Sequence, residues 1–136
     1  MKRRELREEV FKLLFRVEFN TPDDMPEQVK LFLEERDEPL GEKECKLVSE
    51  RYDLIREKVG EIDDLLNKNI EKWNTERIGK VELTVLRIAV FEMLFDEDIP
   101  VTVAINEAVE IAKKYGQDNS GSFVNAILAK FVKTGD

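Results

Sequence analysis

The stretch from Val81 to Phe95, VELTVLRIAVFEMLF, constrains the fold more than any other part of the sequence. Eleven of its fifteen residues are apolar. The run is about twice as long as a typical strand and contains no turn signal, which favours a helix. A helix that is apolar over most of its circumference must be covered by other helices. The segment is therefore predicted to be the central core helix. Its polar residues are Glu82, Thr84, Arg87 and Glu92.

Six further helices are predicted from apolar residues at helical spacing, with proline, glycine or capping residues at their ends. They run from Arg3 to Phe19, Pro26 to Arg36, Glu42 to Lys58, Glu61 to Lys72, Pro100 or Thr102 to Tyr115, and Asn119 or Ser120 through Phe131. Gly60 is expected to end the third of these segments, and Trp73 to anchor a turn. Since no strand pattern is found, the sequence predicts an all-α bundle of about seven helices.

The length and composition suit one domain in a reducing compartment. A chain of 136 residues can bury a core of its own. The single cysteine, Cys45, cannot form an internal disulfide, and its place on an apolar helix stripe predicts a buried structural thiol. There is no signal peptide and no apolar run long enough to span a membrane. We therefore expect a cytoplasmic protein with no membrane contact.

The sequence offers little material for catalysis. It has no histidine for proton transfer near neutral pH and no glycine-rich phosphate loop. Its acidic clusters, such as Asp63-Asp64 and the run from Asp96 to Asp98, fall at predicted helix ends and turns, where solvation explains them. We expect no enzyme activity, no cofactor and no metal site.

The N-terminus is basic although the whole chain carries a net charge of -8. Six cations face three acids in the first sixteen residues; the cations are Lys2, Arg3, Arg4, Arg7, Lys12 and Arg16. On a helix of about 100° per residue, the three N-terminal arginines share one flank, with Phe11 and Phe15 in line with Arg4. Arginines and exposed aromatic rings together suit single-stranded RNA. The alternative is an exposed basic helix start with Phe11 and Phe15 in the core.

Three blocks of sequence resemble the NusB family of bacterial transcription antitermination factors. The longest is IPVTVAINEAVEIAKKYGQDNSGSFVNAIL, from Ile99 to Leu128. VLRIAVFEML and RRELREEVFKLLF match the family's core helix and its arginine-rich start, in the expected order. The likeness covers almost the whole chain. It implies a single helical domain over residues 1–136 made of two small halves, 1–60 and 61–136.

The resemblance also implies a function without catalysis. It implies binding to boxA RNA together with NusE, a small-subunit ribosomal protein, in the RNA polymerase antitermination complex, including during ribosomal RNA transcription. The implied RNA-binding residues are Lys2, Arg3, Arg4, Arg7, Lys12, Phe15, Glu82, Asn119 and Phe123. The chain departs from the family pattern at Ser122, where lysine is frequent, at Ala126, where glycine is common, and at Glu5, which interrupts the arginines. The changes at Ser122 and Glu5 make the RNA face less positive.

Two other functions remain open from the sequence. The same fold occurs joined to ribosomal RNA methyltransferases, but no methyltransferase sequence follows here, so that function is not expected. The second is a protein-only helical adaptor, or a homodimer, in which the basic flank docks an acidic partner. A titration with boxA RNA would separate an RNA reader from an adaptor.

Overall fold

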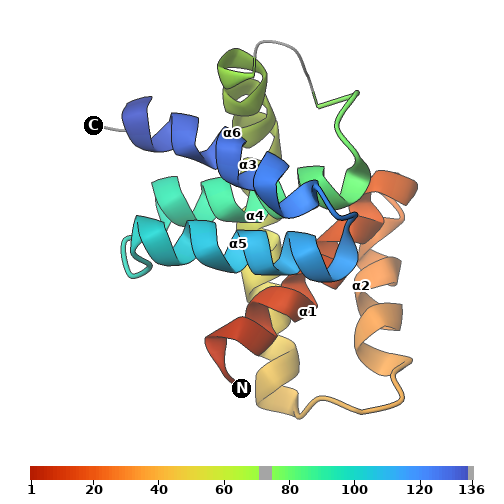
Figure 1. Ribbon diagram of the computed structural model, residues 1–136. Coiled ribbons are helices and arrows are strands. Elements are labelled where there is room, and N and C mark those ends of the chain that lie inside the picture. Colours follow the sequence, from red (N-terminus) through yellow and green to blue (C-terminus); the bar gives the residue numbers. More distant parts are fainter. Residues whose placement is uncertain (71–74, 135–136) are drawn as a thin grey trace. The chain divides into compact units, whose positions relative to one another are not determined.

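The described part of the chain is entirely helical and forms two compact units. The computed structural model describes residues 1–70 and 75–134. These residues form six α-helices and one short 3-10 helix, with no strand among them (Figure 1). The units are Met1–Arg56 and Glu57–Asp136. The predicted all-α class is confirmed, with one α-helix fewer than expected.

The first unit begins with α1 (Arg3–Phe15), which tightens into the 3-10 helix η1 (Arg16–Phe19). The next helix, α2 (Met25–Glu34), carries Pro26 in its first turn, as predicted, and ends two residues earlier than expected. Arg16 ties η1 to α2: its guanidinium donates to Gln28 Oε1 at 3.0 Å and lies 5.2 Å from the centre of the Phe32 ring. The first part of α3 completes this unit.

The predicted break at Gly60 is wrong, because α3 is one helix from Glu42 to Asn69. Gly60 is exposed, and no heavy atom lies within 4 Å of the place where a Cβ would be. A glycine inside a helix costs only about 1 kcal/mol relative to alanine. The buried stripe of α3 continues across it at spacings of three and four residues: Val48, Tyr52, Ile55, Val59, Ile62 and Leu66. The expected helix end at Lys72 and the turn at Trp73 lie outside the described residues.

In the second unit, α4 (Lys80–Phe95) packs against α5 (Val101–Tyr115) and α6 (Ser120–Thr134). Every residue from Leu83 to Glu92 is buried. This confirms that α4 is the central core helix that the sequence predicts. Gly121 lets α6 approach α5 closely, since a Cβ there would lie 3.0 Å from Lys113 Cγ.

Two of the buried polar residues of α4, Thr84 and Arg87, make specific hydrogen bonds. Thr84 Oγ1 donates to the Lys80 carbonyl oxygen at 2.7 Å. The Arg87 guanidinium donates to both carboxylate oxygens of Asp63 in α3, at 2.9 and 2.7 Å. Both side chains of this pair are largely covered, with 8% of Arg87 and 22% of Asp63 exposed. The pair therefore fixes α4 to the C-terminal part of α3 within the second unit.

Cys45 is less buried than the sequence predicts. Its side chain is half-buried, and Sγ lies 3.8 Å from the Leu40 carbonyl oxygen, to which it donates. Cys45 is in the first turn of α3, ahead of Val48, the first fully buried residue of that helix. Apolar spacing alone does not show where along a helix its covering neighbours begin.

None of the described helices is long and apolar enough to cross a membrane.

Candidate nucleic-acid interface

The basic start of α1 lies at the protein surface. Lys2, Arg3 and Arg4 are all exposed. Lys2 precedes the first turn, and its carbonyl oxygen accepts the Leu6 N–H at 3.0 Å. The first turn of a helix also leaves N–H groups pointing outward with partial positive charge. The three cations and the helix start therefore attract an anion together, and Glu5 opposes them locally.

The next two positions of the predicted basic flank are not on the surface. Only 8% of Arg7 is exposed, so RNA binding by Arg7 would require the strand to reach a largely covered side chain. Phe11 is 3% exposed and belongs to the core, as one of the two alternatives for the basic flank predicts, so its ring offers no stacking platform. A helical projection gives the angle between side chains, but it does not say which side faces the core. Phe15 is half-buried, with its ring 6.1 Å from that of Phe11.

An exposed aromatic side chain that the sequence analysis missed follows on η1. Phe19 is 60% exposed, and its ring centre lies 5.1 Å from that of Phe15. A 3-10 helix has 3.0 residues per turn rather than 3.6, so side chains beyond Phe15 leave the directions that α1 sets. The spacing of Phe11, Phe15 and Phe19 was a visible signal for an aromatic row. The sequence gives no comparable signal for the change from α-helix to 3-10 helix that exposes Phe19.

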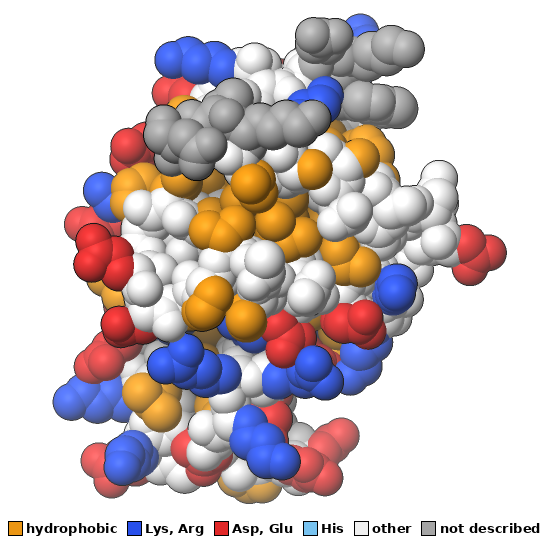
Figure 2. Space-filling view, turned by 60° about the vertical axis from the view of Figure 1, so that its left-hand side comes forward, with side chains coloured by type: hydrophobic (Ala, Val, Ile, Leu, Met, Phe, Trp, Pro, Cys, Tyr) orange, Lys and Arg blue, Asp and Glu red, His pale blue; other side chains and the backbone are white. Residues whose placement is uncertain are grey.

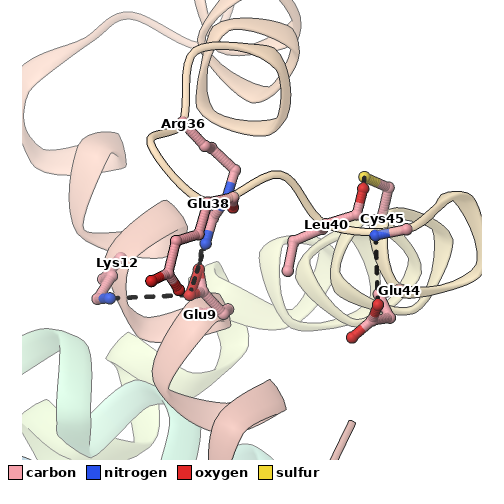
Figure 3. A network of polar contacts seen from close by, with 8 residues as sticks. Glu9, Lys12, Arg36, Glu38, Leu40, Glu44 and Cys45 are labelled. Atoms are coloured by element: carbon pink, nitrogen blue, oxygen red, sulfur yellow. Dashed lines mark hydrogen bonds and ion pairs between the residues drawn. The ribbon is translucent and has the colours of Figure 1, made fainter.

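Lys12 belongs to an ion-paired cluster that still leaves a positive charge at the surface (Figure 3). Glu9 accepts two hydrogen bonds from the Arg36 guanidinium, both at 2.9 Å, and lies 3.7 Å from Lys12 Nζ. The Glu9 carboxylate raises the pKa of Arg36, mainly through this hydrogen bonding. The charges of Glu9, Lys12 and Arg36 sum to one positive charge, and the carboxylate of Glu38, which also interacts with Arg36, offsets it in part. Lys12, 42% exposed, carries the remaining positive charge outward.

In the second unit the structure brings Glu82 to the loop before α6. Glu82 is the third residue of α4, and its Oε1 accepts a hydrogen bond from Ser120 Oγ at 2.7 Å. Asn119 is exposed directly before α6, and Phe123 is half-buried one turn further on. The Phe123 N–H donates to the Asn119 carbonyl oxygen at 3.1 Å. Nothing in the local sequence signals the link from Ser120 to Glu82.

Charges of both signs are interleaved on one face of the protein. On the face seen in Figure 2, Lys and Arg side chains lie among Asp and Glu side chains. Such a face gives no broad positive field. Since the whole chain carries a net charge of -8, attraction of a polyanion depends on local groups such as those of α1. Within residues 1–70 and 75–134, no three His, Cys, Asp or Glu side chains are grouped so that they could hold a metal ion.

Comparison with known proteins gives consistent matches over nearly the whole chain. The model of the NusB family matches residues 4–133. The transcription antitermination protein NusB of Lachnoclostridium phytofermentans is 49% identical over 132 residues, which are 97% of this chain and 99% of that relative. A solved structure of T. maritima NusB has 41% identity and a TM-score of 0.85, covering 98% of this chain and 92% of that one.

A further solved structure contains partners. It is a crystal structure of the antitermination factors NusB and NusE in complex with double-stranded RNA. The matched chain is 25% identical to this one, with a TM-score of 0.82, and the match covers 97% of this chain and 96% of that one.

Proposed function

The chain belongs to the NusB family, and from this we propose that it is a transcription antitermination factor that binds boxA RNA together with NusE. The observation that carries the proposal is the similarity, over 97% of the chain, to a structure that holds NusB, NusE and RNA. The exposed cations at the start of α1 support it, because they offer phosphate contacts on an otherwise acidic protein. We propose that it acts on RNA polymerase in the cytoplasm, including in ribosomal RNA transcription, without catalysing a reaction.

Both units supply RNA contacts in this proposal. Lys2, Arg3, Arg4 and Lys12 of the first unit bind backbone phosphates, since their charges are exposed. Arg7 and Phe15 lie beside them on α1, and Phe15 offers the uncovered part of its ring. In the second unit, Asn119 has a side-chain amide that can pair with a base edge, and Phe123 has a ring on which a base can stack. We also propose that residues 1–136 are a single NusB-like domain, as the family resemblance implies.

The direct test is a fluorescence titration with a boxA RNA oligonucleotide and a scrambled RNA of equal length and composition. The proposal requires tighter binding to boxA RNA, because base contacts as well as phosphate contacts contribute. Equal affinities would leave only charge-driven binding. No binding to either RNA would favour the protein-only adaptor or homodimer.

Arg3→Ala and Arg4→Ala are each expected to weaken boxA binding, since each removes an exposed cation from the proposed strand path. If each arginine contacts a phosphate of single-stranded RNA, the slope of log K against log salt falls by about 0.7 per substitution. Titrations at several salt concentrations measure both effects. Lys30→Ala on α2 is the control, because it removes an exposed cation from the same unit. Losses as large for Lys30→Ala would mean that only total charge matters.

NusE is expected to increase the affinity for boxA RNA. With a net charge of -8 and few exposed cations near α1, the protein alone makes few phosphate contacts, and its acidic remainder repels RNA at low salt. A partner that adds basic groups supplies the missing attraction. The coupling should lie in the usual range of about 1–3 kcal/mol, and RNA must tighten NusE binding by the same factor.

Titration of boxA RNA with and without saturating NusE measures this coupling directly. The reverse titration, of NusE with and without RNA, must return the same factor. Equal RNA affinities with and without NusE, over a range of salt concentrations, would show that the protein reads its RNA unaided.

A further inference from the structure

Ser120 makes a polar link between two segments of the second unit that are 38 residues apart in sequence. Although it opens α6, it is only 1% exposed. Its Oγ accepts the backbone N–H of Gln117 at 2.8 Å and donates to Glu82 Oε1 at 2.7 Å. One hydroxyl group thus joins the loop before α6 to the start of α4.

Two glycines leave the space that this link occupies. A Cβ at Gly116 would lie 2.5 Å from Ser120 Oγ and 2.6 Å from the Ala112 carbonyl oxygen, so a larger residue there would displace the hydroxyl or the backbone. At the other end, a Cβ at Gly79 would lie 2.5 Å from Glu82 Oε2. The hydroxyl therefore lies close against the backbone at Gly116, and the carboxylate close against the backbone at Gly79.

We propose that Ser120 is a positioning residue for RNA binding and that Glu82 acts through it. The link holds the loop from Gly116 to Asn119 in the conformation that presents Asn119 and, one turn later, Phe123. This inference rests on the proposed function. It gives Glu82 a role that its charge allows, since a carboxylate is repelled by RNA phosphates and one of its oxygens is already engaged by Ser120.

The physical effect of losing the link is a change in the population of loop conformations. Without the hydroxyl, the Gln117 N–H loses its acceptor and Glu82 loses its donor. The loop then samples conformations in which Asn119 is displaced. The apparent Kd for RNA rises by the inverse of the fraction of molecules whose loop stays competent for binding.

The test measures boxA RNA affinity by fluorescence titration at fixed salt for variants of both residues. Ser120→Ala and Glu82→Ala should each raise the Kd about three- to tenfold, the range that one hydrogen bond supports. The double variant, Ser120→Ala with Glu82→Ala, should have a Kd no higher than that of the single variant that binds RNA more weakly, because both changes break the same hydrogen bond. Glu82→Gln keeps an acceptor oxygen for the hydroxyl and should bind like the wild type. Thr84→Val is the matched control, since its buried hydroxyl donates to the Lys80 carbonyl oxygen of the same helix.

Hydrogen exchange at the Gln117 amide reports on the loop without RNA. The exchange rate should rise in Ser120→Ala and Glu82→Ala, and stay unchanged in Glu82→Gln and Thr84→Val. A general loss of stability would instead raise exchange throughout the second unit. If Ser120→Ala fails to fold, the comparison of Glu82→Ala with Glu82→Gln still decides, because Glu82 is only half-buried.

Four results would overturn the inference. Additive losses in the double variant, or a loss in Glu82→Gln as large as in Glu82→Ala, would mean that Glu82 contacts RNA itself. Wild-type affinity in Ser120→Ala despite faster Gln117 exchange would mean that the loop needs no positioning, while the proposed function would stand. A wild-type protein that does not prefer boxA RNA would remove the proposed function and this inference with it.

Discussion

Leu86→Ala is expected to lower the free energy of unfolding by about 2–5 kcal/mol, as truncation of fully buried leucines does. Leu86 lies in the middle of α4 and is 0% exposed. Its loss removes apolar burial and leaves a cavity in a segment where ten consecutive residues are buried, so the surroundings can close over it only in part. Urea unfolding followed by circular dichroism measures the change through the midpoint, provided that the m-value stays the same.

Leu94→Ala on the same helix is the matched control. It deletes the same atoms, but Leu94 is 42% exposed, so little burial is lost and no closed cavity forms. Its cost should stay below about 1 kcal/mol. Equal losses at the two positions would show that α4 is not the core helix of the second unit.

The central helix could be predicted because its signal is local and strong. From Val81 to Phe95 apolar residues outnumber polar ones on nearly every side, and only complete burial accommodates that. The predicted helix end at Gly60 was wrong because there the local signal was weaker than the packing of the helix. A glycine is a local signal for a helix end, but the stripe through Ile55, Val59 and Ile62 stays in phase across it, and the packing of that stripe outweighs one unfavourable residue.

The candidate site was predictable in its charged part and not in its geometry. Exposed Arg3 and Arg4 follow from the sequence, because a basic helix start has no reason to be buried. That Phe11 points inward while Phe19 points outward depends on how α1 and η1 pack, which the sequence pattern does not contain. The bond between Ser120 and Glu82 joins residues whose proximity arises only from the packing of α4 and α6.

The pair of Arg87 and Asp63 should be the most sensitive polar contact of the second unit. Arg87→Ala is expected to lower the free energy of unfolding by about 3–5 kcal/mol, because it leaves the Asp63 carboxylate largely covered and without its two charged hydrogen bonds. Since 22% of Asp63 remains exposed, water can reach it in part, and the lower end of that range is expected. Urea unfolding measures the loss. Glu110→Ala, which breaks an exposed 3.8 Å pair with Lys113, is the control and should cost less than about 1 kcal/mol.

A double variant separates two contributions to the free energy of unfolding: the stabilisation by the intact ion pair, and the cost of leaving one of its charges without a partner. In Arg87→Met with Asp63→Leu, no charge is left without a partner, and apolar side chains of similar length fill the space between α3 and α4. Stability should return to near the wild-type level, because the attraction in a covered pair is largely offset by the cost of removing both charges from water. If the double variant stays as unstable as Arg87→Ala, the hydrogen bonds themselves stabilise the contact of α3 with α4. If Arg87→Ala costs no more than Glu110→Ala, solvent reaches Asp63 freely, and the pair does not hold the two helices together.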